Sequence, residues 1–237
     1  MKISIIIPVF NESNTIIKIL EKIHNYKLAD NYNFEIIIVN DGSTDNTIEK
    51  LKTNKNLYDK LIHIINNQGK GHALNLGFKE ATGDIILIQD ADLEYDPSDY
   101  KKLLLPFEKY DADVVYGSRF KSSEVNRVLF FWHSIANKII TLLSNIVSNL
   151  NLTDVETGYK LFKKELIKNI ELKEKRFGIE IEITHKIANI IPQKKIFEVG
   201  ISYNGRPYSE GKKIGIKDAF AAVYCIFKYG LLQRLKK

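Results

Sequence analysis

The segment Gly83-Asp84-Ile85-Ile86-Leu87-Ile88-Gln89-Asp90-Ala91-Asp92-Leu93-Glu94-Tyr95-Asp96-Pro97 joins a run of apolar residues to a cluster of acids. The apolar run is mostly β-branched, which is typical of a strand buried on both faces. Asp90, Asp92 and Glu94 follow it directly. Because alternate side chains of an extended chain point the same way, we expect these three carboxylates on one side of the strand end.

The three carboxylates indicate either a cation site or a solvated turn. In an extended chain, successive members would lie roughly 6 to 7 Å apart, too far for a closed cage unless the chain bends. This spacing suits Mg²⁺ or Mn²⁺, which take one or two carboxylates and complete their shell with water and substrate phosphates. Asp96 and Pro97 then predict the N-cap and first residue of a helix.

Strand and helix patterns alternate in the part of the chain before these acids. Strands are expected at residues 3–9, 34–39 and 61–65, each followed by polar residues and a helix. This alternation predicts an α/β, Rossmann-like, mostly parallel sheet with right-handed crossovers. Ligands of such sheets bind beyond the carboxyl ends of the strands, so we expect the polar clusters there to form one site. The clusters lie at residues 8–12, 40–45, 66–71 and 90–94.

Two common nucleotide-binding motifs are absent from the sequence. Dinucleotide binding needs Gly-x-Gly-x-x-Gly after the first strand, where this chain has Pro8-Val9-Phe10-Asn11-Glu12. No Gly-x₄-Gly-Lys-Ser/Thr motif occurs either. Gly69-Lys70-Gly71 is compatible with two interpretations, a phosphate-binding turn that offers amides and a cation, or a flexible turn.

A long amphipathic segment, residues 128–150, marks the second half of the chain. It follows an expected strand at 112–116. We expect its apolar stripe to pack mainly in the core, with a membrane surface or a dimer face as alternatives. His133, Asn137, Thr141 and Ser144 lie off the stripe. The stripe consists of Val128, Phe131, Trp132, Ile135, Ile139, Leu142, Leu143, Ile146 and Leu150.

The rest of the second half carries further polar segments. Residues 151–158 form a polar connection that contains Asp154 and Glu156. A helix is expected at 177–190 and a strand at 196–203. The basic loop that follows, residues 204–213, is interpreted either as a lid over a diphosphate or as a solvated loop.

The 237 residues have the composition of a soluble protein and a net charge of +6, and their number allows one domain or two small ones. Because the sequence shows no internal repeat and no linker, we treat the chain as one domain. The bases are concentrated at the end, where residues 211–237 contain seven bases and one acid. We expect residues 219–235 to form a helix, either lying on an anionic membrane surface or packed on the protein. One cysteine, Cys225, and no pattern of a signal peptide or membrane span predict a cytoplasmic location, with peripheral membrane contact through that helix.

The ordered motifs resemble those of family-two glycosyltransferases, which have the GT-A fold. Within that family the chain is similar to the dolichyl-phosphate mannose synthase and dolichyl-phosphate glucosyltransferase branch. The resemblance covers nearly the whole chain. Its motifs are Ser4-Ile-Ile-Ile-Pro-Val-Phe-Asn-Glu12, Val39-Asn-Asp-Gly-Ser-Thr-Asp45, Gly69-Lys-Gly71, Gln89-Asp-Ala-Asp-Leu-Glu-Tyr-Asp-Pro97, Gly117-Ser-Arg119, Glu198-Val-Gly-Ile-Ser-Tyr-Asn-Gly-Arg206 and Glu210-Gly-Lys-Lys-Ile-Gly215.

The resemblance implies a nucleotide-sugar donor of the UDP-glucose or GDP-mannose type, Mg²⁺ or Mn²⁺, and inversion at the anomeric carbon. It implies that residues 1–110 bind the donor and residues 111–237 the acceptor. Asp90, Asp92 and Glu94 match the metal–diphosphate motif, although mannose synthases often carry Gln at the position of Glu94. The positions that match donor binding are Pro8, Phe10, Glu12, Val39, Asp41 and Lys70, and those that match the donor phosphates are Arg206 and Lys212.

The acceptor implied by the resemblance is a polyprenyl or dolichyl phosphate. Such a phosphate is already a nucleophile, so it needs cations to position it rather than a general base. Arg119 matches one such cation. The further candidates, at and before the start of the amphipathic segment, are Arg127, His133 and Ser134. A sugar-hydroxyl acceptor would need a carboxylate base, for which Asp154 and Glu156 are candidates, although both residues suit a role in bracing their loop equally well. A non-catalytic nucleotide-sugar-binding subunit is a second alternative, and no nucleic-acid partner is expected.

Overall fold

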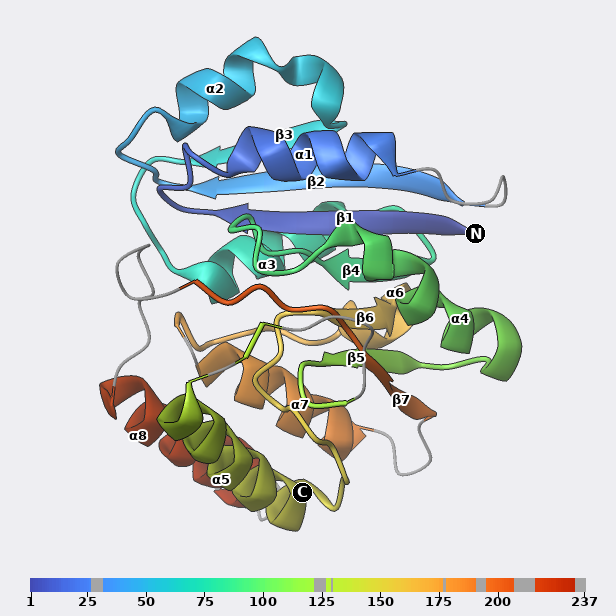
Figure 1. Ribbon diagram of the computed structural model, residues 1–237, viewed down its shortest axis with the longest axis vertical. Helices are drawn as coiled ribbons and strands as arrows, with labels where there is room; N and C mark the ends of the chain where they lie inside the picture. Colours follow the sequence, from blue (N-terminus) through green and yellow to red (C-terminus); the bar gives the residue numbers. More distant parts are fainter. Residues whose placement is uncertain are drawn as a thin grey trace.

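The structure, a computed structural model, describes residues 1–26, 32–121, 127–128, 130–176, 178–190, 195–206 and 216–232. Its centre is a seven-stranded sheet in the order β3-β2-β1-β4-β6-β5-β7 (Figure 1). All neighbours are parallel except β6, which runs antiparallel to both β4 and β5. The predicted mixed, mostly parallel sheet is therefore confirmed. The strands are β1 (Lys2–Val9), β2 (Asn33–Asp41), β3 (Lys60–Ile64), β4 (Ile85–Ile88), β5 (Val114–Ser118), β6 (Lys160–Lys163) and β7 (Ile196–Gly200).

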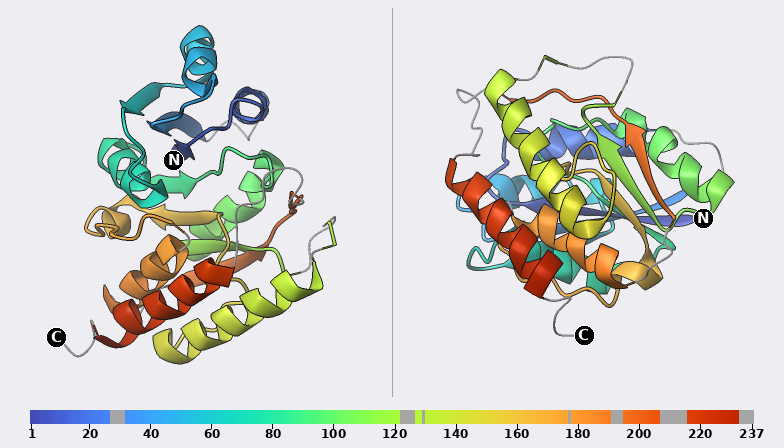
Figure 2. Two further views of the ribbon diagram at one scale, coloured as in Figure 1. Left: turned by 90° about the vertical axis from the view of Figure 1, so that its left-hand side faces the viewer. Right: turned by 90° about the horizontal axis from the view of Figure 1, so that it is seen from below.

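Helices cover both faces of the sheet (Figure 2). Alternation along β1 divides the core, because Ile5 and Ile7 pack with α1 and α4 while Ile6 packs with α3 on the other face. That second face also carries α5, α7 and α8. The helices are α1 (Ile16–Asn25), α2 (Thr47–Thr53), η1 (Lys55–Leu57), α3 (Lys70–Glu80), η2 (Pro97–Asp99), α4 (Tyr100–Tyr110), α5 (Phe131–Ser148), α6 (Lys164–Ile167), α7 (Gly178–Ile190), α8 (Ile216–Cys225) and η4 (Ile226–Leu232).

The first half follows the sequence pattern closely. Its four strands and the helices between them lie where strand–helix alternation predicts. The predicted cap is also present, since Asp96 Oδ1 accepts a hydrogen bond from Ser98 N at 2.9 Å and Pro97 begins η2. In the second half β5 begins at Val114 rather than at residue 112. The short strand β6 was not predicted, because its four residues carry only two apolar side chains between lysines.

The expected core role of the α5 stripe is wrong for most of its length. Phe131, Trp132, Ile139, Leu142 and Ile146 are exposed, and Trp132 retains 74% of its accessible surface. The polar face points inward instead, where its residues find hydrogen-bond partners. The buried residues of α5 are Asn137, Ile140, Thr141, Ser144 and Ser148.

Buried hydrogen bonds explain this orientation of α5. Asn137 Nδ2 donates to Asp154 Oδ1 at 3.1 Å, and Ser144 Oγ lies 3.2 Å from His185 Nε2. Ser148 Oγ donates to the carbonyl of Ser144 at 2.7 Å. Burying polar groups costs little when each has a partner, so the polar face can pack against the protein. Within the described residues, no helix has the length and apolar character needed to cross a membrane.

Candidate active site

The loops after β1, β2 and β3 are joined at the carboxyl edge of the sheet. The Asn11 backbone NH donates to Ser43 Oγ at 3.0 Å, and the Thr44 backbone NH donates to Asn11 Oδ1 at 2.8 Å. The Asp41 carboxylate accepts from the backbone NH groups of Gln68 at 2.9 Å and Gly69 at 2.7 Å. The predicted convergence of these polar clusters is therefore confirmed.

Among the residues matched to donor binding, Pro8 and Val39 are register partners on β1 and β2. Val39 is fully buried, whereas Phe10 is exposed directly beyond β1. Pro8 and Val39 therefore lie side by side at this edge of the sheet, and Phe10 lies on the surface of the protein beyond it. Their role as base and ribose contacts stays a prediction.

The acids after β4 do not continue an extended strand. β4 ends at Ile88, and the chain then turns, with Leu93 at φ +65° and the Glu94 backbone NH donating to Asp92 Oδ1 at 3.1 Å. The expectation that Asp90, Asp92 and Glu94 share one face of an extended chain is therefore wrong, because the strand ends before them. The bend brings their charges close together instead.

Arg206 draws three of the predicted carboxylates together. Its guanidinium lies 3.4 Å from Glu12 Oε2 and 3.1 Å from Asp92 Oδ2. Its backbone NH donates to Glu94 Oε1 at 2.8 Å, while Tyr203 Oη donates to Glu94 Oε2 at 2.7 Å. Glu94 is thus engaged in holding the segment after β7. Lys212, the second predicted phosphate-binding cation, lies outside the described residues.

The charge at this turn favours a bound cation. Burial, together with the nearby carboxylates of Asp90 and Glu94, raises the pKa of Asp92 to about 7, although Arg206 opposes the shift. Within the described part of the chain, no three Asp, Glu, His or Cys side chains are arranged to hold a metal by themselves. Asp90 and Asp92 fit a site of the Mg²⁺ type, in which two carboxylates are supplemented by water and donor phosphates.

Lys70 connects this turn to α7. Its Nζ lies 2.9 Å from Asp90 Oδ1 and 2.9 Å from Glu180 Oε1. Burial disfavours its charge, but the two carboxylates outweigh that effect and raise the pKa of Lys70. Gly69 is the N-cap of α3 at φ +96°, where a Cβ would lie 2.4 Å from the Lys175 carbonyl oxygen. The interpretation of residues 69–71 as a flexible turn is therefore wrong, because they begin a helix.

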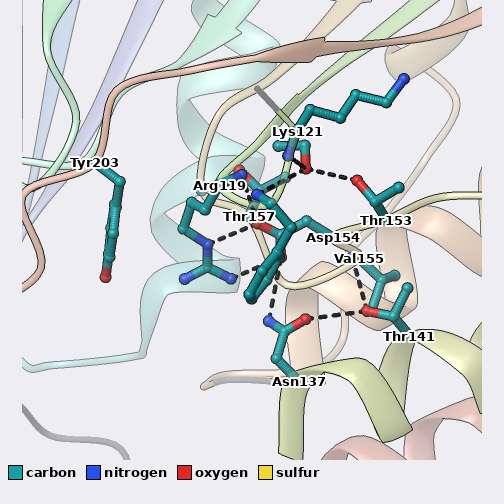
Figure 3. A network of polar contacts seen from close by, with 12 residues as sticks. Arg119, Lys121, Asn137, Thr141, Thr153, Asp154, Val155, Thr157 and Tyr203 are labelled. Carbon is teal, nitrogen blue, oxygen red and sulfur yellow. Dashed lines mark hydrogen bonds and ion pairs between the residues drawn. The ribbon is translucent and has the colours of Figure 1, made fainter. Parts of the chain in front are cut away.

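On the acceptor side, Arg119 and Asp154 form a buried bidentate ion pair (Figure 3). Arg119 Nε and Nη2 donate to the two oxygens of Asp154, each at 2.7 Å. Burial opposes ionisation of Asp154, but Arg119 and Asn137 lower the pKa of this carboxyl below its usual value. Because Arg119 and Asn137 already bond both of its oxygens, Asp154 is suited to stabilising the connection of residues 151–158.

Glu156, two residues further along, has a different environment. Burial, followed by repulsion from Glu180, raises the pKa of Glu156 to about 7. A general base at neutral pH needs a pKa near that value. Nearby Lys160 is buried, donates to the Thr157 carbonyl, and has its pKa lowered to about 8, chiefly by burial.

The other acceptor candidates lie at the beginning of α5. The Arg127 backbone NH donates to the Tyr203 carbonyl at 3.1 Å, and Arg127 Nη1 donates to the Gly205 carbonyl at 3.0 Å. His133 packs edge-on against Phe130, and the Ser134 NH donates to the Phe130 carbonyl at 3.0 Å. These contacts place the start of α5 beside the segment that carries Arg206.

Tyr203 and Glu180 were not predicted as site residues. Tyr203 bonds Glu94, and its ring lies 5.1 Å from the guanidinium carbon of Arg119, so it joins the donor and acceptor sides. The sequence signals for it were its place in the motif of residues 198–206 and its position directly before the glycine-bearing loop. Glu180 was visible only as an acid in the first turn of a predicted helix.

Comparisons with known proteins agree with this geometry. Residues 4–171 match the model of the family described as glycosyl transferase family 2. The chain is 30% identical to dolichol-phosphate mannosyltransferase of Pyrococcus furiosus, over 100% of this chain and 67% of that protein. It is 23% identical to dodecaprenyl-phosphate galacturonate synthase of Rhizobium johnstonii, over 100% of this chain and 68% of that protein. The chain thus spans about two thirds of the length of these relatives.

A solved structure supports the fold. Glucosyl-3-phosphoglycerate synthase of Mycobacterium tuberculosis, in complex with Mn²⁺ and UDP-glucose, superposes with a TM-score of 0.73. The match covers 97% of this chain and 79% of that protein at 18% identity, which confirms the expected GT-A architecture. By its family match and its fold, the chain belongs to glycosyl transferase family 2 and is a glycosyltransferase.

Proposed function

We propose that this protein transfers a hexose from a UDP- or GDP-sugar to a polyprenyl phosphate, with inversion and with Mg²⁺ or Mn²⁺. The observation that carries the proposal is the convergence of Glu12, Asp92 and Glu94 on Arg206. The preceding residue, Gly205, accepts a hydrogen bond from Arg127, which lies four residues before α5, a helix that presents apolar residues outward. The Pyrococcus furiosus and Rhizobium johnstonii relatives are named for sugar transfer involving lipid phosphates, which supports the acceptor class.

The donor side supplies charge where the reaction needs it. A nucleoside diphosphate gains negative charge as it leaves the sugar, and a cation held by Asp90 and Asp92 would stabilise that charge. Arg206 lies beside Asp92, so its guanidinium is positioned to contact the same diphosphate. We assign the corresponding role at the far end of the diphosphate to Lys212 from its motif position.

The acceptor side requires positioning more than proton transfer. A lipid phosphate carries roughly 1.5 to 2 negative charges at neutral pH and attacks without a general base. Arg127 lies four residues before α5 and His133 and Ser134 lie in its first turn, and we assign to these three residues the orientation of the phosphate. Arg119 is already paired with Asp154, so we assign it to fixing the loop that faces the acceptor.

One observation favours a sugar hydroxyl as a second candidate acceptor. A hydroxyl must lose its proton, and Glu156, whose pKa is raised to about 7, is suited to accept it. Asp154 is less suited because Arg119 and Asn137 occupy its oxygens. Glu156→Gln separates the two acceptors. It would abolish transfer to a hydroxyl and leave transfer to a lipid phosphate largely intact.

The outward residues of α5 continue onto α8 and η4, which lie beside α5 (Figure 2). We call this area the apolar helix surface. α5 contains no acid and carries Lys138. α8 and η4 contain one acid, Asp218, and two lysines, Lys217 and Lys228, and Lys228 pairs with Glu174 at 2.7 Å. The surface consists of Phe131, Trp132, Ile139, Leu142, Ile146, Phe220, Tyr224, Phe227 and Leu231.

We assign an anionic lipid bilayer to the apolar helix surface. Exposed aromatic and aliphatic residues together with lysines are the features of helices that lie in a membrane interface. The first two residues of the surface, Phe131 and Trp132, follow Arg127 by four and five residues, and we propose that a lipid phosphate enters there with its chain in the bilayer. The peripheral membrane contact expected from residues 219–235 therefore extends to α5.

Vesicle flotation tests this assignment. The Trp132→Ser/Leu142→Ser variant should bind vesicles with anionic lipid about tenfold or more weakly than the wild type. In the proposed complex the bilayer buries both of these large apolar side chains, and the variant lacks them. Ile65→Ser is the matched control, because Ile65 is 84% exposed but lies outside the surface. Equal binding by all three proteins would contradict the assignment, and a wild-type dimer lost in the double variant would identify a second copy as the occupant.

The proposed reaction is tested with radiolabelled UDP-glucose and GDP-mannose, each with Mg²⁺ or Mn²⁺ and a short polyprenyl phosphate. Label entering the lipid phase from one donor supports the proposal and identifies the base. Donor consumption without a labelled lipid would favour the hydroxyl acceptor. Binding of a donor with no turnover under any condition would favour the non-catalytic subunit.

A further inference from the structure

Glu180 has no role in the proposed reaction, yet it lies directly behind the predicted cation ligands. It belongs to the first turn of α7 and is only 9% exposed. Its Oε1 accepts from Lys70 Nζ at 2.9 Å, and the same ammonium lies 2.9 Å from Asp90 Oδ1. Lys70 therefore bridges a carboxylate at the site and a carboxylate behind it.

The bridge places Lys70 in competition with a cation. Asp90 Oδ1 already has an ammonium partner, so a divalent ion that binds this oxygen must displace Lys70 or share it. A displaced ammonium in a partly buried site needs another anion close by, since an unpaired charge there is costly. Glu180 already contacts Lys70 and can keep it without movement of the main chain.

We propose that Lys70 is a displaceable counter-ion on Asp90, and that Glu180 is the positioning residue that retains Lys70 when a divalent cation binds. This inference rests on the metal dependence of the proposed function and adds a determinant of metal affinity on α7.

Packing between the starts of α3 and α7 supports a shift of the side chain alone. A Cβ on Gly71 would lie 2.0 Å from the carbonyl oxygen of Glu174, in the segment before α7, and 3.2 Å from Ile179 Cδ1 on α7, so the start of α3 is in close contact with this part of the chain. With Gly69 also packed against Lys175, the main chain at Lys70 has little room to move. The ammonium, at the end of four flexible methylenes, can move between two oxygens.

The charges around Glu180 make its removal informative. Lys70 contacts it directly, and the buried Lys160 ammonium also lies within electrostatic reach. Removing the Glu180 carboxylate therefore leaves Lys70 with one of its two contacting carboxylates, Asp90, and so strengthens its competition with a cation for that residue. Removing the Lys70 ammonium has the opposite effect, because Asp90 then loses its competitor for the cation.

The test is a Mn²⁺ titration of the donor-free protein, followed by electron paramagnetic resonance of the free ion. Glu180→Gln should bind Mn²⁺ about tenfold more weakly than the wild type, as expected for one uncompensated charge several ångströms away at intermediate dielectric. Lys70→Met should bind Mn²⁺ more tightly than the wild type. The Lys70→Met/Glu180→Gln double variant should return close to the wild-type affinity, and Lys70→Arg should stay near it.

Glu80→Gln is the matched control for charge. It changes the net charge by the same amount at the other end of α3, about 15 Å from Lys70 by helix rise, where Glu80 pairs with Lys60. Its Mn²⁺ affinity should equal that of the wild type. Melting temperatures of all variants show whether any of them is misfolded.

A purely structural role for Glu180 predicts a different result, in which both single variants weaken Mn²⁺ binding together or leave it unchanged. Either outcome would overturn the proposal, as would a wild-type protein that binds no Mn²⁺ in the absence of a donor. Failure of the proposed transferase function is recognised separately, by the absence of labelled product in the donor assay.

Discussion

Two arginines hold the two sides of the site, and their surroundings differ. Arg119 faces Asp154 in a buried, bidentate pair, so positive and negative charge are balanced. Arg206 faces Glu12, Asp92 and Glu94 at longer distances, with Asp90 nearby, so negative charge is in excess. We therefore propose that the balanced pair of Arg119 and Asp154 stabilises the structure, and that the carboxylates around Arg206 bind a further cation.

The pKa values of the two aspartates express the same contrast. The pKa of Asp154 is lowered even though burial opposes ionisation, because Arg119 compensates its charge. The pKa of Asp92 is raised, because burial and two neighbouring carboxylates outweigh Arg206. The environment of Asp92 therefore favours binding of a divalent cation, whereas the charge of Asp154 is already compensated by Arg119.

The largest effect on activity is expected from Asp92→Asn. The amide keeps the shape of the side chain but removes a charge from the cation site, so kcat/KM should fall roughly 10³-fold, or about 4 kcal/mol. The measurement is sugar transfer at saturating Mn²⁺, with the thermal melt as a check on folding. Turnover like that of the wild type in a folded variant would remove the metal mechanism.

Asp154→Asn should have its largest effect on stability. The substitution leaves the Arg119 guanidinium buried without a counter-charge, and breaking such a pair costs about 3 kcal/mol or more. Urea denaturation should show this loss of unfolding free energy. A stability loss below about 1 kcal/mol would mean that the pair is not the brace inferred from its geometry.

Arg206→Lys should give a smaller loss of activity with little loss of stability. Lysine keeps the charge but lacks the planar guanidinium that contacts both Glu12 and Asp92. We therefore expect kcat/KM to fall about 30-fold, which corresponds to roughly 2 kcal/mol of transition-state stabilisation. Arg119→Lys is the matched comparison and should affect unfolding more than catalysis. If Arg206→Lys instead lost mainly stability and Arg119→Lys mainly activity, the roles assigned to the two arginines would be reversed.

The sequence was sufficient to predict that the polar clusters after β1, β2, β3 and β4 meet, because topology alone brings strand ends together, whereas their role in donor binding stays a prediction. Parallel strands put Glu12, Asp41 and Asp90 at one edge whatever the details of side-chain packing. The bend at Leu93 was not predictable, since a leucine at positive φ carries no sequence signal. Nor was the partner of Glu180, because it depends on how α7 packs against α3.

The orientation of α5 shows a limit of periodicity. The pattern of residues 128–150 correctly separates an apolar face from a polar face, but it cannot say which one meets the protein. Asn137 and Ser144 face inward because Asp154 and His185, distant in sequence, offer them hydrogen bonds. The apolar face of α5 is then exposed on the protein surface, where we propose that it contacts the bilayer.

The smallest predicted effect concerns Glu156, two residues after Asp154. Its pKa in the folded protein is raised to about 7, from an ordinary value of 4.5. The folded state thus binds the proton more tightly than the unfolded state, so this group's contribution to stability is complete below pH 4.5 and is lost as the pH rises through 7. Because Glu156 is partly exposed, we expect a loss of about 1 to 2 kcal/mol rather than the full value of the shift.

Glu156→Gln removes this pH dependence. The variant should be more stable than the wild type at pH 8, by that amount, and the difference should shrink as the pH falls toward 5. Urea denaturation at pH 5, 6.5 and 8 measures it, and a difference that does not change with pH would show that the carboxyl group of Glu156 is not held in its neutral form by burial. Transfer to a lipid phosphate should change less than threefold in the same variant, since that acceptor needs no base.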